Sequence, residues 1–221
     1  MADTPGTPDG TDDDADDRDG VLEKALNRVV SMNSGLARRH VEHFGAGKTG
    51  NALLRRLDRQ YRLAVTGSGA AVGAAAIVPG LGTAASVVLT GGQAVATLEA
   101  TMLYVLSYAE ATGVEVDDVD RRRVLLMAVL LGQTGQQVVE KVLGNSDEHW
   151  GALVAHGAPQ KVIKQVNREL RGRFFRAYGV QQGVLALARL LPFGAGAAVG
   201  GVAGAASSGA VIKATRRAFA V

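Results

Sequence analysis

Two long stretches of the sequence contain no charged residue and consist largely of Gly and Ala, and they limit the fold more than any other feature. They cover residues 63–98 and residues 190–212. Both contain nearly the same heptapeptide, Gly-Ser-Gly-Ala-Ala-Val-Gly at 67–73 and Gly-Ala-Gly-Ala-Ala-Val-Gly at 194–200. Because small residues let two helix backbones approach closely, the repeat predicts two distant helices that pack against each other.

The spacing of the glycines supports this interpretation. Glycine recurs every fourth residue, which places these residues on one side of a helix. The expected helix-packing positions are Gly69, Gly73, Gly196, Gly200 and Gly204. Pro79 and Gly80 should break the first stretch into a helical hairpin, since Pro cannot continue a helix and Gly tolerates a turn. We therefore expect an all-α bundle in which a hairpin at about 63–98 packs against a C-terminal helical segment at about 190–212.

Helical periodicity continues outside these stretches. It predicts a helix from about Gly20 and another from near Asn51. Asp117 or Asp118 should cap a further helix, which contains eight consecutive apolar residues at 124–131 and continues to Leu143. Such an apolar run is typical of a helix buried on most sides. No segment has the pattern of a strand.

Negative charge is concentrated at the N-terminus. Residues 1–20 contain eight Asp and one Arg, whereas the rest of the chain is basic. A segment so poor in large apolar groups does not bury enough surface to offset the entropy of ordering it. We expect a disordered acidic tail at 1–20, followed by one helical domain at 21–221. An acidic start without an apolar core also differs from a secretory leader, so we expect a protein of the cytoplasm or of the cytoplasmic face of the cell membrane.

The segment from Gln160 to Tyr178 predicts an amphipathic helix that ends at Gly179. Its apolar stripe consists of Val162, Ile163, Val166, Leu170, Phe174 and Tyr178, and its other face carries Lys161, Lys164, Arg168, Arg171 and Arg176. A basic face of this kind is often simply solvated. It can also contact anionic lipid, in which case the acidic tail would compete for it. Aromatic residues are few and no nucleic-acid module is present, so lipid headgroups are the expected anionic partner and nucleic acid is not.

The uncharged stretches leave three membrane arrangements open. A limb of about 16 residues is roughly 24 Å long, shorter than the hydrocarbon core of about 30 Å. The segments can insert stably, stay buried in a bundle attached to the membrane, or form a hairpin that inserts only conditionally.

Two short motifs resemble parts of known functional sites, but both are incomplete. Gly45-Ala-Gly-Lys-Thr49 resembles half of a phosphate-binding loop, but Glu42 stands where the first Gly of the full motif belongs. A helix end at Gly45 is therefore expected. His40 and His43 are spaced for one helix face, yet a third ligand at suitable spacing and any Cys are missing. No catalytic residue, cofactor or metal site is predicted.

The order of the motifs resembles the EcsC-like protein family over roughly residues 21–221. The resemblance rests on Val78-Pro-Gly-Leu-Gly82, on Gly113-Val-Glu-Val-Asp117 and on the ending that begins Arg189-Leu-Leu-Pro-Phe-Gly194. Thr112 departs from the Tyr that is common at its position in the family. The resemblance implies a bacterial helical protein associated with the membrane, and the family takes its name from a gene beside those of an ABC-type transporter.

We therefore expect a non-enzymatic, membrane-associated accessory or regulatory protein, linked to a membrane transporter, another membrane protein or a second copy of itself. It is expected to be peripheral or inserted. One alternative is a conditional membrane-inserting or pore-type protein that uses the 63–98 hairpin. Another is an enzyme whose site the sequence does not reveal.

Overall fold

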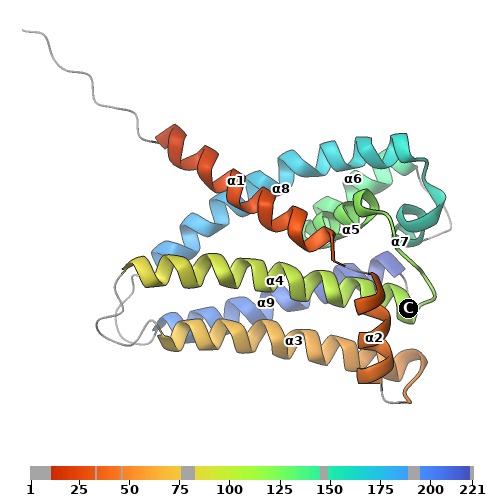
Figure 1. Ribbon diagram of the computed structural model, residues 1–221, viewed down its shortest axis with the longest axis horizontal. Coiled ribbons are helices and arrows are strands. Elements are labelled where there is room, and N and C mark those ends of the chain that lie inside the picture. The colour runs from red at the N-terminus through yellow and green to blue at the C-terminus, as the bar shows by residue number, and fades with distance from the viewer. Residues whose placement is uncertain are drawn as a thin grey trace, which may run out of the picture.

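The computed structural model describes residues 11–219 except 33, 46, 76–82, 145–148 and 189–194. This part of the chain forms helices and no strand (Figure 1), which confirms the predicted all-α class. The elements are α1 (Thr11–Val30), α2 (Ser34–Gly45), α3 (Gly50–Ala75), α4 (Thr83–Ala111), α5 (Val119–Leu131), α6 (Gln133–Leu143), α7 (Trp150–Ala152), a π-helical turn η1 (Leu153–Gly157), α8 (Gln160–Ala188) and α9 (Ala195–Phe219).

The predicted packing of distant segments is confirmed. Helices α3 and α4 are the two limbs of the expected hairpin, and α9 contains most of the C-terminal small-residue stretch. Helix α3 packs along α9 more extensively than any other described pair of helices, and it also packs along α4 (Figure 1). The break at Pro79 and Gly80 lies outside the described residues.

Helix α5 lies at the centre of the molecule. Residues 124–129 are all at most 1% exposed, and α1, α4, α6, α8 and α9 pack around them. The burial expected from the apolar run is thus confirmed. The helix does not continue to Leu143, however. Gly132 has a φ of +62°, and the chain turns there into α6, because Gly enters this backbone region without steric cost.

Three consecutive arginines attach α5 to its surroundings. The Asp118 carboxylate caps the helix by accepting a hydrogen bond of 2.9 Å from the Arg121 amide, as predicted. The Arg121 guanidinium donates to the carbonyl of Val154 in η1 and to that of Ala158 just after η1. Arg122 donates to a carbonyl in the loop before α5 and to that of Met32 just after α1, and Arg123 donates to the Asn27 side chain. A buried guanidinium is tolerated here because backbone oxygens satisfy it.

Two predicted helix limits are wrong. Helix α1 begins at Thr11, within the segment expected to be disordered, and residues 1–10 lie outside the described part. Its buried C-terminal half, which includes Leu26 and Val29, anchors the helix in the core, and Asp residues near a helix N-terminus interact favourably with the helix dipole. Helix α8 continues through Gly179 to Ala188, since one interior Gly costs only about 1 kcal/mol.

Candidate membrane-contact surface

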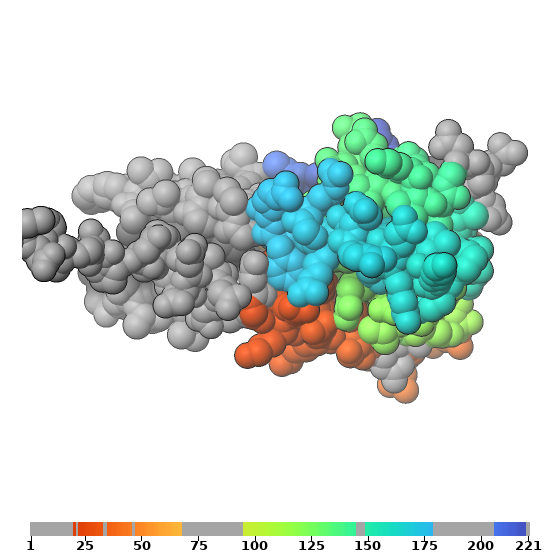
Figure 2. Space-filling model, turned by 90° about the horizontal axis from the view of Figure 1, so that it is seen from above, coloured from red at the N-terminus to blue at the C-terminus, as the bar shows by residue number. Residues whose placement is uncertain are grey.

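The first half of α8 has the two faces that its sequence predicts. Ile163, Val166, Leu170 and Phe174 are fully buried, and they attach the helix to α5 and α6. The predicted lipid-contact residues all lie on the exposed side, and they are Lys161, Lys164, Arg168, Arg171 and Arg176. Figure 2 shows this half of α8 lying open along one face of the molecule. A basic strip is therefore available at the surface.

Arg171 is the member of this strip that also makes contacts within the protein. Its guanidinium donates to the Glu23 carboxylate of α1 at 2.7 Å and lies 5.5 Å from the centre of the Phe175 ring. The pair is solvent-exposed on both sides, so its contribution to stability is small. The ion pair nevertheless connects the C-terminal half of α1 to α8.

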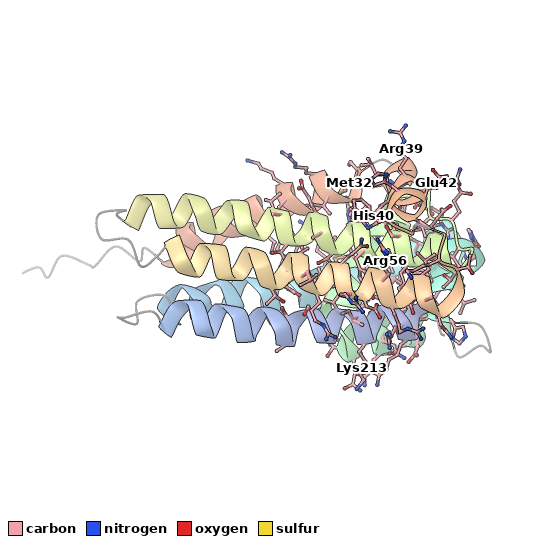
Figure 3. The ribbon with its side chains drawn as sticks, turned by 90° about the horizontal axis from the view of Figure 1, so that it is seen from below. Met32, Arg39, His40, Glu42, Arg56 and Lys213 are labelled. Carbon is pink, nitrogen blue, oxygen red and sulfur yellow. The ribbon has the colours of Figure 1, made fainter. Side chains whose placement is uncertain are left out.

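Four helix ends without charge lie at one end of the molecule. The C-terminal ends of α3 and α8 and the N-terminal ends of α4 and α9 point the same way (Figures 1 and 3). The helical residues 63–75, 83–98, 177–188 and 195–212 contain no charged side chain. We call these residues the uncharged end. It lies opposite α2 and α7 (Figure 1).

The predicted glycine positions lie in two of these helix ends. Gly69 and Gly73 belong to α3, and Gly196, Gly200 and Gly204 belong to α9. Their helices pack along each other, whereas the contacts of these five glycines lie outside what the structure describes. The proposal that they line the contact stays a prediction.

A buried polar network, which the sequence analysis missed, joins three helices where the uncharged end begins. The Asp58 carboxylate of α3 accepts a hydrogen bond from the Tyr104 hydroxyl of α4 at 2.6 Å and one from the Arg216 guanidinium of α9. Asp58 is only 7% exposed, so these partners replace the water that its charge loses. Next to it, the Tyr61 ring stacks on that of Tyr104, and its hydroxyl pairs with Thr101.

The sequence contains a signal for this network. Asp58 is the only acidic residue between Glu42 and Glu99, and it follows Leu57 on the apolar side of α3. An acid at an inward position requires a buried partner. Its partner could not be named, because Arg216 is 158 residues further along the chain.

The two short motifs lie in α2 and directly after it. Helix α2 ends at Gly45, as expected. The rings of His40 and His43 both contact that of Phe44, with centroids 4.7 Å and 4.8 Å apart, and burial lowers the pKa of His40. Within the described residues, no group of three or more His, Cys, Asp or Glu side chains is placed to hold a metal ion.

A hollow of about 240 Å³ lies between α2, the end of α4 and the loop before α5. Arg38 crosses it and pairs with Glu110 at 3.1 Å and Glu115 at 3.0 Å. Glu110 is the main cause of the raised pKa of Arg38. The charged groups of this hollow therefore satisfy one another.

No protein-family model matches the sequence, and no match was found among curated proteins or solved structures. The resemblance to the EcsC-like family thus stays a prediction from sequence. In the described part of the chain, none of the helices combines the length and the apolar character that crossing a bilayer requires.

Proposed function

We propose that this protein is a non-enzymatic accessory or regulatory protein that attaches to anionic membranes, with a membrane transporter or another membrane protein as its partner. The resemblance to the EcsC-like family favours such a role. The location that follows is the cytoplasmic face of the cell membrane.

One observation carries the proposal. The basic strip on α8 continues directly into the uncharged half of the same helix, which ends beside three other uncharged helix ends. Basic side chains attract anionic headgroups, worth about 1 kcal/mol each near the surface. Uncharged residues next to them can approach lipid without the cost of desolvating charge. Both properties occur together on one part of the molecule.

Vesicle co-sedimentation tests the proposal. The protein is mixed with vesicles of phosphatidylcholine alone or with a third phosphatidylserine, and the bound fraction is measured at increasing salt. We expect binding to the anionic vesicles only, and weakening with salt because exposed charges are screened. The triple variant Lys161→Gln, Lys164→Gln, Arg168→Gln removes about 3 kcal/mol of attraction, on the order of a hundredfold in affinity.

A charge-matched variant provides the control. Arg39→Gln, Lys48→Gln, Arg55→Gln removes three exposed charges from α2, the following loop and α3, so it lowers the net charge equally. It should retain most of the binding. An equal loss in both triple variants would mean that net charge alone is responsible, and an absence of binding to either vesicle would refute the proposed function.

The conditional membrane-inserting alternative is favoured by a separate observation. Both limbs of the 63–98 hairpin contribute helical residues to the uncharged end. Insertion would then be a second step that follows attachment.

A further inference from the structure

In each of the four helices of the uncharged end, the last charged residue lies at a similar distance from the tip. The charged residues nearest to it are Arg62 in α3, Glu99 in α4, Arg176 in α8 and Lys213 in α9. From there to the described helix ends, at 1.5 Å per residue, α3 and α4 extend about 20 and 24 Å, and α8 and α9 about 18 and 27 Å. One boundary therefore crosses all four helices.

From this boundary we infer that the protein meets an anionic bilayer with the uncharged end first and inserts these helix ends up to the level of Arg62, Arg176 and Lys213. The inference rests on the proposed function and specifies the part of the surface that enters lipid. It differs from attachment through the basic strip alone, which would leave the uncharged end in water. The strip would make the first contact, and insertion of the uncharged end would follow as a second step.

The charges at the boundary suit the headgroup region. Arg62, Arg176 and Lys213 are exposed, and Lys213 points away from the body of the protein (Figure 3). Among the four helices of the uncharged end, Glu99 is the acidic residue at this level, and it is paired with Arg28 at 3.2 Å. Long basic side chains can keep their charges at the headgroups while the neighbouring helix lies deeper. The boundary thus presents positive charge to anionic lipid.

The lengths limit how deep the protein can go. Stretches of about 18 to 27 Å fall short of the hydrocarbon core of about 30 Å. Helical backbones satisfy their own hydrogen bonds and so tolerate this environment. Gly and Ala add little apolar driving force, however, so the attraction of the boundary charges has to contribute. Insertion up to the boundary should therefore take the helix tips past the middle of the bilayer but stop short of the far headgroups, and it should depend on anionic lipid.

Because the chain contains no Cys, single Cys substitutions can each carry an environment-sensitive NBD label. Val72→Cys lies in the uncharged end of α3, Leu63→Cys at the boundary and Asn51→Cys at the opposite end of the same helix. Gln165→Cys marks the basic half of α8. The labelled proteins are mixed with phosphatidylserine-containing vesicles that carry a spin-label quencher either deep in the acyl chains or at the headgroups. Circular dichroism of each labelled protein verifies that it is folded.

We expect the deep quencher to act on the label at position 72, the headgroup quencher on the label at 63, and neither on the label at 51. If the label at 165 is quenched while that at 72 is not, the protein binds lipid along α8 and the inference is wrong, although the proposed function stands. If no labelled protein binds the vesicles, both are wrong.

Charge reversal at the boundary gives a second, label-free test. The double variant Arg62→Glu, Lys213→Glu should bind anionic vesicles at least tenfold more weakly, since it places acidic groups at the headgroup level. Lys48→Glu, Arg55→Glu makes the same change in net charge far from the boundary and should bind nearly as the original protein does. Equal weakening of the two double variants would overturn the inference.

Discussion

Asp58 joins α3, α4 and α9 where the uncharged end begins. Its carboxylate has two partners on two other helices, the Tyr104 hydroxyl and the Arg216 guanidinium. Small residues beyond this point allow close packing but do not fix how one helix is placed along another. A buried hydrogen-bond network does, because a shift along the helix axis would leave polar groups unsatisfied.

Replacing Asp58 by Ala should therefore lower the free energy of unfolding by about 2 to 3 kcal/mol, since the buried Tyr104 hydroxyl loses its acceptor. Arg216→Ala should cost about 1 kcal/mol, because half of this side chain is in solvent. Arg217→Ala, on the exposed side of the same turn, serves as the control and should change stability by less than about 0.5 kcal/mol. Urea denaturation followed by circular dichroism measures all three, and equal losses would contradict the role of the network.

The pKa values of the four tyrosines determine how the free energy of unfolding should change at alkaline pH. Burial is the main cause that raises the pKa of Tyr61, to about 12, and also those of Tyr104, Tyr108 and Tyr178. The unfolded chain binds these protons more weakly, with a pKa of about 10. The contribution of these tyrosines to the free energy of unfolding is therefore fully present below about pH 10. It is lost as the pH rises toward their pKa values in the folded protein.

We therefore expect tyrosinate absorbance to appear only together with loss of helical circular dichroism, above about pH 10. The urea-unfolded protein should titrate earlier and without cooperativity. Titration of the folded protein at the same pH as the unfolded chain would contradict the burial of these rings.

At the scale of elements, hydrophobic periodicity predicted which helix faces are buried but did not predict every helix end. The stripe of α8 and the apolar run of α5 are buried as predicted, because an apolar pattern at helical spacing has no other stable place in a bundle. The break at Gly132 and the continuation of α8 through Gly179 were missed. Both involve Gly, which tolerates a turn and a helix alike, so packing of the neighbouring helices decides between them.

The same reasoning limits what could be predicted for the candidate site. The basic strip of α8 followed from the sequence because its members share one helix. The common boundary of four helices did not, since it depends on the ends of α3, α4, α8 and α9 lying at the same end of the molecule (Figure 1).

Gly135→Ala tests the close packing at the corner between α5 and α6, and Gly172→Ala in α8 serves as its comparison. A Cβ added at Gly135 would lie 2.2 Å from the Ala128 carbonyl oxygen, so Gly135→Ala should separate the helices and cost about 2 to 3 kcal/mol. Gly172 lies in the exposed middle of α8, where nothing approaches within 4 Å. Gly172→Ala should stabilise the protein by about 0.5 to 1 kcal/mol. Thermal denaturation measures both, and a stable Gly135→Ala protein would contradict the close approach.

For the molecule as a whole, charge is distributed unevenly along the long axis. From Glu23, which is paired with Arg171, α1 extends back toward the uncharged end (Figure 1). Residues 12–19 of this helix contain six Asp and one Arg. A negative helix beside the surface that would meet anionic lipid opposes that contact.

Changing the six Asp residues at 12–19 to Asn should therefore strengthen binding to phosphatidylserine-containing vesicles by at least about tenfold, given roughly 1 kcal/mol per charge near such a surface. Binding to pure phosphatidylcholine vesicles should not change, which provides the control. Weaker or unchanged binding to the anionic vesicles would show that α1 does not hinder attachment.

The packing of α3 along both α4 and α9 has a consequence for how lipid would respond to this protein. These helices pack together as one unit, and each is about 10 Å across, so in this arrangement they would enter a leaflet together. Entry would displace the lipid area of the whole group at once, and the work against lateral pressure would grow with that area. Loosely packed or strongly curved membranes would accordingly admit the protein more readily than flat, tightly packed ones.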